Sequence, residues 1–412
     1  MRWCSTLPPH GGLHEPPLAA IGILSTPERH SFRGVLRNTW LQHMPASLSP
    51  WFVLRGVGLP ADSPLLAEAS FADVVLVEAA ANASRAVGPL HSLFLWFRCA
   101  VDIFSETRFI SKLDDDVWLY PNGVAALLRS LLPLIGDTAD ELYIGSFEGY
   151  HWDELDGRPV GWSGKFPMTV GCVRRTPSGR KALNGSVAGP FSFAKGPALF
   201  LSAGLVRLLV RDPTADPRCL PGSRTFWAEG TVALGSDGRA AATRCNFSLA
   251  ANPRAIRRPT LPWEDVWLGY LLSQLRPGAP SPLQPTPLRR VVVVHLSSDL
   301  THDEWGFRSK ATALWWHSRT DDSIGSRMPK LNHYMRQHAC PAPANLSIGT
   351  HSHKAACSGK HRDFAGTPYT TLSCAGLPWL VCRQGRGLFG PGKRGRAGNC
   401  TSAQVDLLRL VQ

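Results

Sequence analysis

The strand-like run Arg108-Phe-Ile-Ser-Lys-Leu113 leads straight into three aspartates, Asp114, Asp115 and Asp116. Carboxylates repel one another, so three of them at the end of an apolar strand favour a counter-charge, and hard divalent cations such as Mg²⁺ and Mn²⁺ prefer carboxylate oxygen. Side chains alternate along a strand, so Asp114 and Asp116 point the same way and Asp115 points opposite. The run predicts a strand that presents a D-x-D metal site; a solvated acidic turn is the alternative.

Strand and helix patterns alternate on both sides of this run. Residues 90–104, for example, carry apolar side chains at the spacing of a helix that packs on a sheet. Alternation of this kind predicts an α/β fold with parallel strands, whose ligand crevice lies beyond the carboxyl ends of the strands. The expected strands are 19–24, 51–54, 73–77, 109–113, 142–144 and 290–295, and the expected helices are 28–41, 90–104, 122–132 and 264–275.

The periodic pattern weakens beyond residue 147 of the 412 residues. Residues 148–187 predict loops and hairpins, and the Pro/Gly-rich segment 211–262 reads as an inserted loop in which Cys219 and Cys245 are candidates for a disulfide. The expected organisation is a disordered leader at 1–18, a main domain at 19–328 that includes the 211–262 loop, and an irregular, basic Gly/Cys-containing extension at 329–412.

The net charge of +13 is concentrated in that extension. Residues 329–412 hold eleven Lys/Arg and two acidic residues, so only +4 remains on residues 1–328. The main domain is therefore nearly balanced and contains no nucleic-acid-binding pattern of basic and aromatic residues. The ten cysteines form no C-x-x-C pair, which disfavours a zinc or thioredoxin-type site.

Five of the nine asparagines begin N-x-S/T sequons, more than the one or so that chance predicts. This frequency predicts a glycosylated protein of the secretory pathway, whose cysteines are able to form disulfides. No apolar run reaches the ~20 residues that a bilayer requires, and residues 1–18 lack the apolar region of a signal peptide. The N-glycosylation candidates are Asn82, Asn184, Asn246, Asn345 and Asn399.

Four further motifs carry chemistry-bearing residues. Arg33 and Arg37 lie one helical turn apart and suit phosphate, although an exposed basic helix is the commoner explanation. The run Phe193-Ala-Lys-Gly-Pro-Ala-Leu-Phe-Leu-Ser202 contains a Gly-Pro turn at which the backbone either approaches a ligand or simply reverses. Trp263-Glu-Asp-Val-Trp-Leu-Gly269 places two acids in the first turn of a helix, where capping is the plain alternative. His295 ends an apolar strand.

In this order, the motifs resemble glycosyltransferase family 31, the β-1,3-galactosyltransferase and N-acetylglucosaminyltransferase group that includes the Fringe proteins. The resemblance spans roughly residues 21–316, and its closest matches are Lys112-Leu-Asp-Asp-Asp-Val117 and Glu264-Asp-Val-Trp-Leu-Gly269. It implies a GT-A nucleotide-sugar transferase fold with a central, mostly parallel mixed sheet. One departure is Ala198, which stands where the family has the second glycine of its G-P-G turn.

The resemblance also implies roles for the site residues. Asp116 is the expected Mn²⁺ ligand, Asp114 its helper, and His295 the imidazole that completes the metal shell, with His302 as its runner-up. Asp265 matches the aspartate that takes the proton of the acceptor hydroxyl in an inverting transfer. The expected donor-binding residues are Arg33, Arg37, Lys112, Asp114 and Asp115, and the expected acceptor-site residues are Glu264, Trp267, Phe193 and Gly196.

The function that follows from the resemblance is transfer of a hexose, with galactose favoured, from a UDP-sugar to a glycan or glycoprotein hydroxyl in β-1,3 linkage. The open alternatives are UDP-N-acetylglucosamine as donor, a catalytically lost binding or chaperone-like relative, and a metal-dependent phosphohydrolase. By resemblance the protein is expected in the Golgi lumen, as a type II membrane protein whose anchor is absent from this sequence. UDP-galactose is the favoured donor, and no nucleic-acid partner is expected.

Overall fold

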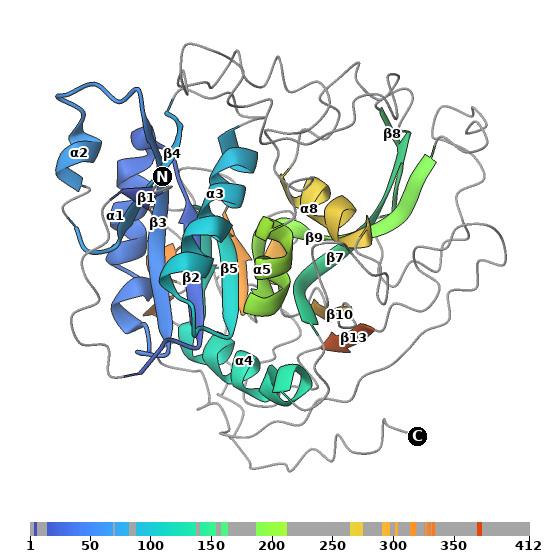
Figure 1. Cartoon of the computed structure of the whole chain (residues 1–412). Helices are drawn as coiled ribbons and strands as arrows, with labels where there is room; N and C mark the ends of the chain where they lie inside the picture. The colour runs from blue at the N-terminus through green and yellow to red at the C-terminus, as the bar shows by residue number, and fades with distance from the viewer. Residues whose placement is uncertain are drawn as a thin grey trace, which may run out of the picture.

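The fold is described from a computed structural model of the chain (Figure 1). The structure describes residues 4–5, 15–68, 71–81, 88–136, 141–153, 158–163, 187–211, 264–274, 291–296, 301–303, 314–318, 325, 328–330, 332–333 and 369–372.

A large mixed sheet forms the centre of the described structure, and its strand order is β1-β4-β3-β2-β5-β9-β7-β10-β13, with β8 paired to β7. A small second sheet has the order β11-β12-β6. The strands are β1 Cys4–Ser5, β2 Ala19–Leu24, β3 Leu48–Val57, β4 Val74–Ala80, β5 Phe109–Asp114, β6 Val117–Leu119, β7 Glu141–Asp153, β8 Arg158–Ser163, β9 Val187–Ser202, β10 Val291–Leu296, β11 Thr301–Asp303, β12 Trp315–His317 and β13 Tyr369–Leu372.

Parallel pairing joins β4, β3, β2 and β5 into one block, and β7, β10 and β13 into another. Strand β2 is buried along its whole length, as expected for a continuous apolar strand in the middle of a parallel sheet. Strand β9 runs antiparallel between β5 and β7 and joins the two blocks. The α/β class with a mostly parallel mixed sheet is therefore confirmed.

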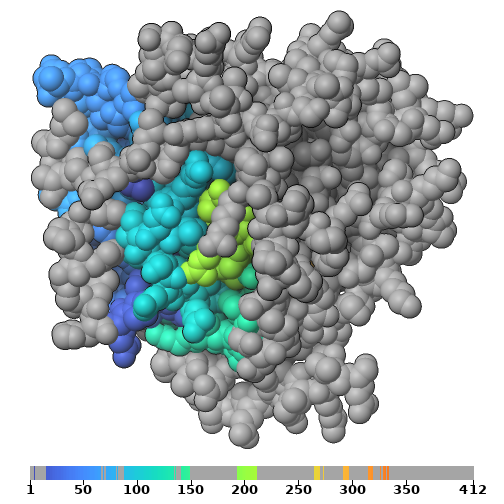
Figure 2. Space-filling model, viewed as in Figure 1, coloured from blue at the N-terminus to red at the C-terminus, as the bar shows by residue number. Residues whose placement is uncertain are grey.

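Helices cover both faces of the sheet and bury two apolar clusters. One cluster contains side chains of α1 and α4, and the other contains side chains of α3, α5 and α8. In Figure 2, α3 (cyan) and α5 (yellow-green) lie side by side on the visible face, and the two helices are in contact. The helical elements are η1 Pro27–Arg29, α1 His30–Arg37, η2 Trp40–His43, α2 Pro64–Glu68, α3 Gly88–Ile103, α4 Pro121–Gly136, α5 Ala203–Arg211 and α8 Glu264–Gln274.

Most of the expected elements agree with these bounds to within a few residues, but β7 continues to Asp153, well beyond the strand expected at 142–144, and α5 was not among the expected helices. The Gly-Pro turn expected at Gly196 lies inside the long strand β9. The register between β9 and β7 shifts at this point, between the pairs formed by Gly145 and Phe147. A register irregularity is where a strand tolerates proline, because proline has no N–H to donate to the ladder.

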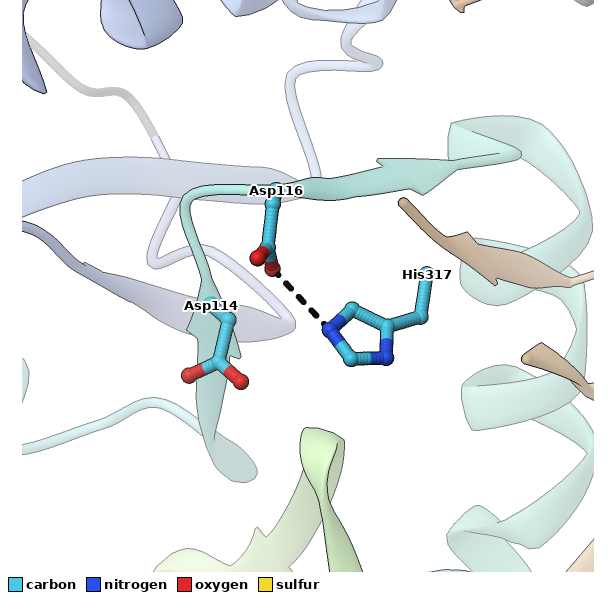
Figure 3. Close-up of side chains that lie close together, drawn as sticks. All are labelled: Asp114, Asp116 and His317. Carbon is cyan, nitrogen blue, oxygen red and sulfur yellow. Dashed lines mark ion pairs between the residues drawn. The ribbon is translucent and has the colours of Figure 1, made fainter. Parts of the chain in front are cut away.

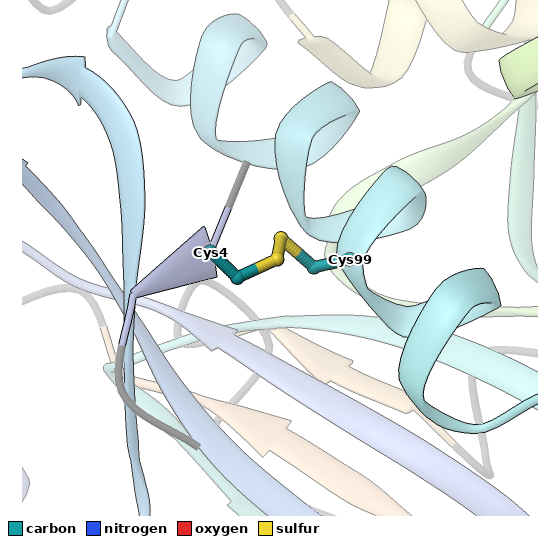
Figure 4. Close-up of a disulfide and its surroundings, with 2 residues drawn as sticks. All are labelled: Cys4 and Cys99. Atoms are coloured by element: carbon teal, nitrogen blue, oxygen red, sulfur yellow. A yellow bond between two sulfur atoms is a disulfide. The ribbon is translucent and has the colours of Figure 1, made fainter. Parts of the chain in front are cut away.

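The two ends of the chain contribute strands to the large sheet. In the leader expected to be disordered, β1 pairs with β4, and Cys4 forms a disulfide with Cys99 on α3 (Figure 4). In the expected extension, β13 pairs with β10. These pairs tie pieces of both terminal segments to the main sheet. The remaining domain boundaries stay predictions, and the proposed Cys219–Cys245 disulfide lies outside the described residues. Among the described helices, none is long and apolar enough to cross a membrane.

Gly22 on β2 lies directly under the indole of Trp96, so we expect Gly22→Ala to destabilise the fold. A Cβ at Gly22 would lie 2.3 Å from Trp96 Nε1, which donates a hydrogen bond to Ser111 O at 2.8 Å. Trp96 is fully buried and cannot move away freely, so the expected loss is about 3 kcal/mol of unfolding free energy, from overpacking plus a weakened hydrogen bond. Urea denaturation measures it. The control is Gly34→Ala in α1, where a Cβ meets nothing within 4 Å and helix propensity rises; equal losses in both variants would contradict the packing argument.

Candidate active site

Two aspartates and one histidine form a group that is able to hold a metal ion. Ligand atoms of Asp114, Asp116 and His317 all lie within 4.8 Å of one another. Figure 3 shows the three side chains converging, with His317 Nε2 3.3 Å from Asp116 Oδ1. Asp116 Oδ1 is buried and has no hydrogen-bond partner within the described part of the chain. A buried oxygen of this kind beside a second carboxylate and an imidazole fits a divalent cation.

Strand pairing brings His317 to this place. Asp114 ends β5, Asp116 lies in the turn before β6, and β12 pairs antiparallel with β6 so that His317 lies opposite Val117. The next residue, Ser318, donates its N–H to Asp116 O at 2.8 Å. The pairing of β12 with β6 and the hydrogen bond from Ser318 to Asp116 therefore hold His317 beside the turn.

Asp115 faces away from the metal group, as alternation along the chain predicts. It is almost fully buried, and its carboxylate accepts hydrogen bonds from Ser25 Oγ at 2.5 Å and from Arg29 Nη1. Burial raises the pKa of Asp115 to about 6, although Arg29 and Ser25 favour the charged form. Arg29 also lies 3.9 Å from Asp116 Oδ2. Asp115 thus anchors the turn that carries Asp116, rather than facing a donor.

The two arginines expected to bind the donor are engaged with acids beside α1. Arg33 is fully buried, and its guanidinium contacts Glu68 at 2.5 and 2.8 Å and Ser25 Oγ at 2.9 Å. Arg37 contacts Asp73 at 2.8 and 3.0 Å and Glu68 at 2.8 Å. Such bidentate pairs satisfy the planar guanidinium groups. The geometry therefore assigns both arginines to holding α1 and α2 in place, and the fully buried Arg33 does not belong to an exposed basic face.

Lys112 and Gly196 connect the metal group to α8. The Lys112 ammonium, fully buried, lies 2.6 Å from Asp114 Oδ1 and 2.9 Å from Glu264 Oε1, and it also donates to Gly196 O. Gly196 donates its N–H to Asp265 Oδ2 at 2.8 Å. A Cβ at residue 196 would lie only 3.2 Å from that oxygen, so glycine allows the close approach of β9 to Asp265.

Asp265 lies at the first turn of α8 with both carboxylate oxygens oriented by backbone amides. Oδ2 accepts from Gly196, and Oδ1 accepts from Val266 at 2.8 Å. Each carboxylate oxygen has a second lone pair, so the group is still able to accept a proton. Burial and the neighbouring charge of Glu264 raise the pKa of Asp265 to about 7, against the opposing effect of Lys112. A carboxylate whose pKa lies near neutrality suits a general base.

The other expected acceptor residues divide into two kinds. Glu264 is partly buried, and although burial alone would raise its pKa, the charge of Lys112 holds that pKa below its usual value. Trp267 and Phe193 are each only 2% exposed, and the Trp267 ring packs edge-on against Phe94 at 6.4 Å between centroids. The expectation that these two aromatic side chains face an acceptor is corrected, because they pack in the core.

His295 does not belong to the metal group, which corrects the ligand expected from the sequence. It lies within β10, opposite Gly145 of β7, and its Nδ1 accepts the N–H of Phe147 at 3.0 Å. Burial lowers the pKa of His295 to about 4, so the ring is neutral at physiological pH. The histidine that the structure places beside the aspartates is His317, which sequence reasoning missed. Its three-residue strand is too short for a periodic signal, so its pairing with β6 is the signal that identifies it.

Some of the expected sites lie outside the described residues or side chains. This applies to the five sequons at Asn82, Asn184, Asn246, Asn345 and Asn399, and to the side chain of His302.

The mostly parallel mixed sheet, with the possible metal site of Asp114, Asp116 and His317 at the end of β5, is compatible with a GT-A fold. The comparison with protein families agrees, because residues 31–212 match the galactosyltransferase family model. The matched segment is a little under half of the chain, and over these residues the chain is similar to the galactosyltransferase family. The family match includes Asp114 and Asp116 and ends before α8 and His317.

No curated protein matches the chain. Among solved structures, the crystal structure of mannose-1-phosphate geranyltransferase from Thermus thermophilus is similar to 70% of this chain and 84% of that chain, at 11% identity and a TM-score of 0.26.

Proposed function

We propose that the protein transfers galactose from UDP-galactose to a hydroxyl of a glycan or glycoprotein, with inversion, to form a β-1,3 linkage. The observation that carries the proposal is the connection between the Asp114, Asp116 and His317 group and Asp265 through Lys112 and Gly196. A chain of direct contacts thus joins the residues suited to hold a metal and a diphosphate to the residue suited to accept a proton. We also propose that the protein acts in the Golgi lumen as a type II membrane protein.

Asp114, Asp116 and His317 are the residues that would hold the cation, and Mn²⁺ is the proposed ion because it accepts both carboxylate and imidazole ligands. When bound, such a cation supplies charge neutralisation to the diphosphate leaving group and orients it. Arg29, which contacts Asp115 and lies near Asp116, supplies a fixed positive charge beside the same group.

Asp265 is the proposed general base. As the acceptor oxygen forms its bond to the anomeric carbon, the bond from that carbon to the UDP oxygen breaks and its electron pair leaves with UDP. The hydroxyl proton passes to the carboxylate of Asp265, which the amides of Gly196 and Val266 hold in a fixed orientation. Inversion follows because the acceptor attacks from the face opposite the leaving group.

The proposal is tested by following UDP release with Mn²⁺, a panel of UDP-sugars and a set of β-linked acceptor glycans. We expect turnover with UDP-galactose that depends on both the metal and the acceptor, and a β-1,3 product by linkage analysis. If only UDP-N-acetylglucosamine is turned over, the donor is UDP-N-acetylglucosamine and not UDP-galactose. If UDP binds in the presence of Mn²⁺ but no donor is turned over, the protein is a binding protein and not an enzyme. Release of inorganic phosphate would indicate a phosphohydrolase.

The raised pKa of Asp265 predicts how transfer depends on pH. The base acts when ionised, so kcat is expected to rise with pH and to level off above about 7, falling about tenfold per pH unit well below that value. Initial rates between pH 5 and 9 at saturating metal and substrates measure this. The contribution of Asp265 to folding stability changes with pH in the opposite direction to kcat. A carboxyl whose folded pKa exceeds its unfolded value contributes stability at low pH, and that contribution is lost as pH rises through about 7. A kcat that stays flat from pH 5 to 8 would contradict the assignment.

A further inference from the structure

The Lys112 ammonium has a full set of partners inside the protein. It is 0% exposed and contacts one oxygen on each of three separate segments: Asp114 of β5, Gly196 of β9 and Glu264 of α8. An ammonium group carries three N–H donors, so these three oxygens account for all of them. Burial alone would lower the pKa of Lys112, but the charges of Asp114 and Glu264 raise it, and the side chain is a cation. No N–H remains for a phosphate or a sugar.

The contacts of Lys112 connect the metal group with the surroundings of Asp265. On one side the ammonium holds Asp114, a member of the metal group. On the other side it holds Glu264 and the carbonyl of Gly196, whose own N–H fixes Asp265 Oδ2. The position of Asp265 relative to Asp114 is therefore set through one buried cation and the backbone of one residue, Gly196.

We propose that Lys112 is a positioning residue that couples the metal group to Asp265, and that it does not bind the donor. The inference rests on the proposed function, because it assigns Lys112 to the geometry of that reaction. Without the ammonium, Asp114 and Glu264 would be two carboxylates in a poorly solvated place without their shared counter-charge, and they would repel. One of the two amides that orient Asp265 would be less firmly placed, since the Gly196 backbone would lose its contact with Lys112.

This coupling has a kinetic signature that a donor contact would not have. Lys112→Met keeps the aliphatic part of the side chain and removes the charge. The metal group loses a positive neighbour, so Mn²⁺ binding is expected to stay within about threefold of wild type or to tighten, and UDP binding is expected to follow it. Transfer is expected to fall about 100-fold in kcat, because displacement of a catalytic group by about 1 Å costs that much.

Hydrogen exchange supplies a readout that is independent of turnover. The N–H groups of Gly196 and Val266 both donate to Asp265 and so report its orientation. We expect Mn²⁺ with UDP to slow the exchange of these two amides in wild type, and to leave them unaffected in Lys112→Met although the metal still binds. Glu264→Gln, which keeps its volume and weakens one contact of Lys112, is expected to change kcat and exchange in the same direction by a smaller factor.

The matched control is Lys195→Met on β9, because the ammonium of Lys195 pairs with Glu148 at 2.6 Å and is 36% exposed. It should retain wild-type metal binding, exchange and transfer. A loss of UDP affinity in Lys112→Met as large as the loss in kcat would overturn the proposal, and so would an unchanged kcat or amides that still respond to Mn²⁺. If Lys112→Met does not fold, the same comparison is decided by Glu264→Gln. If wild type turns over no UDP-sugar, the proposed function fails, and the exchange experiment alone decides the coupling.

Discussion

Replacing Asp265 with asparagine is expected to lower kcat for sugar transfer by at least about 10³-fold while UDP and Mn²⁺ binding stay near wild type. Asparagine has almost the same shape and still accepts hydrogen bonds from the amides of Gly196 and Val266, so the surroundings of the side chain are preserved. What it cannot do is take the proton of the acceptor hydroxyl. The measurements are initial rates of UDP release and calorimetric titration of UDP with Mn²⁺ present.

The control for this experiment is Asp102→Asn, an exposed carboxylate on α3, which should retain full activity. Loss of UDP binding in Asp265→Asn would contradict the role of base, since it would place the side chain against the donor. Residual activity within about tenfold of wild type would also contradict it. The residual rate is expected to be independent of pH around 7, because the group whose pKa governs the wild-type profile is gone.

The second large effect is expected at the metal group, where Asp116→Asn and His317→Gln should each weaken Mn²⁺ binding on the order of 100-fold and lower transfer with it. Both substitutions leave polar side chains of similar size but remove a negative charge or an imidazole nitrogen from the group. Because the metal is proposed to be held with the diphosphate, UDP affinity in the presence of Mn²⁺ should fall in parallel. Electron paramagnetic resonance of free Mn²⁺ measures the binding directly.

His295→Gln tests whether the metal ligand is His317, as the structure indicates, or His295, as expected from the sequence. His295 accepts the N–H of Phe147 at 3.0 Å inside the sheet, so its replacement is expected to lower stability and to leave the affinity for Mn²⁺ within about twofold. If His295→Gln weakened Mn²⁺ binding and His317→Gln did not, the metal group derived from the structure would be wrong. A melting curve of each variant separates loss of fold from loss of metal.

Much of the architecture was predictable because apolar periodicity is a local property. The run at 19–24 reads as a buried strand and forms one, and the run before Asp114 reads as a strand that ends in acids and does so. The helix that begins at Glu264 was also predictable from its acids and apolar spacing. In each case a few neighbouring residues carry the information.

The partners of charged side chains were not predictable in the same way. Arg33 and Arg37 suit phosphate as a pattern, yet Glu68 and Asp73, more than 30 residues away along the chain, take up their guanidinium groups. Lys112 reads as part of a donor-binding motif, and two of its three partners lie on β9 and α8. An ion pair between distant segments leaves no mark in either segment alone.

The sequence by itself determined the chemistry that is available: carboxylates at the end of β5, a second acidic pair at the start of α8, and a glycine at residue 196 between them. Only the tertiary structure decided which of these groups meet. The pairing of β12 with β6 brings His317 to Asp116, and the packing of α8 beside β9 brings Asp265 to Gly196. The physical reason is that side-chain identity and periodicity are properties of short segments. Strand register and helix packing bring the site together, and they depend on the whole sheet.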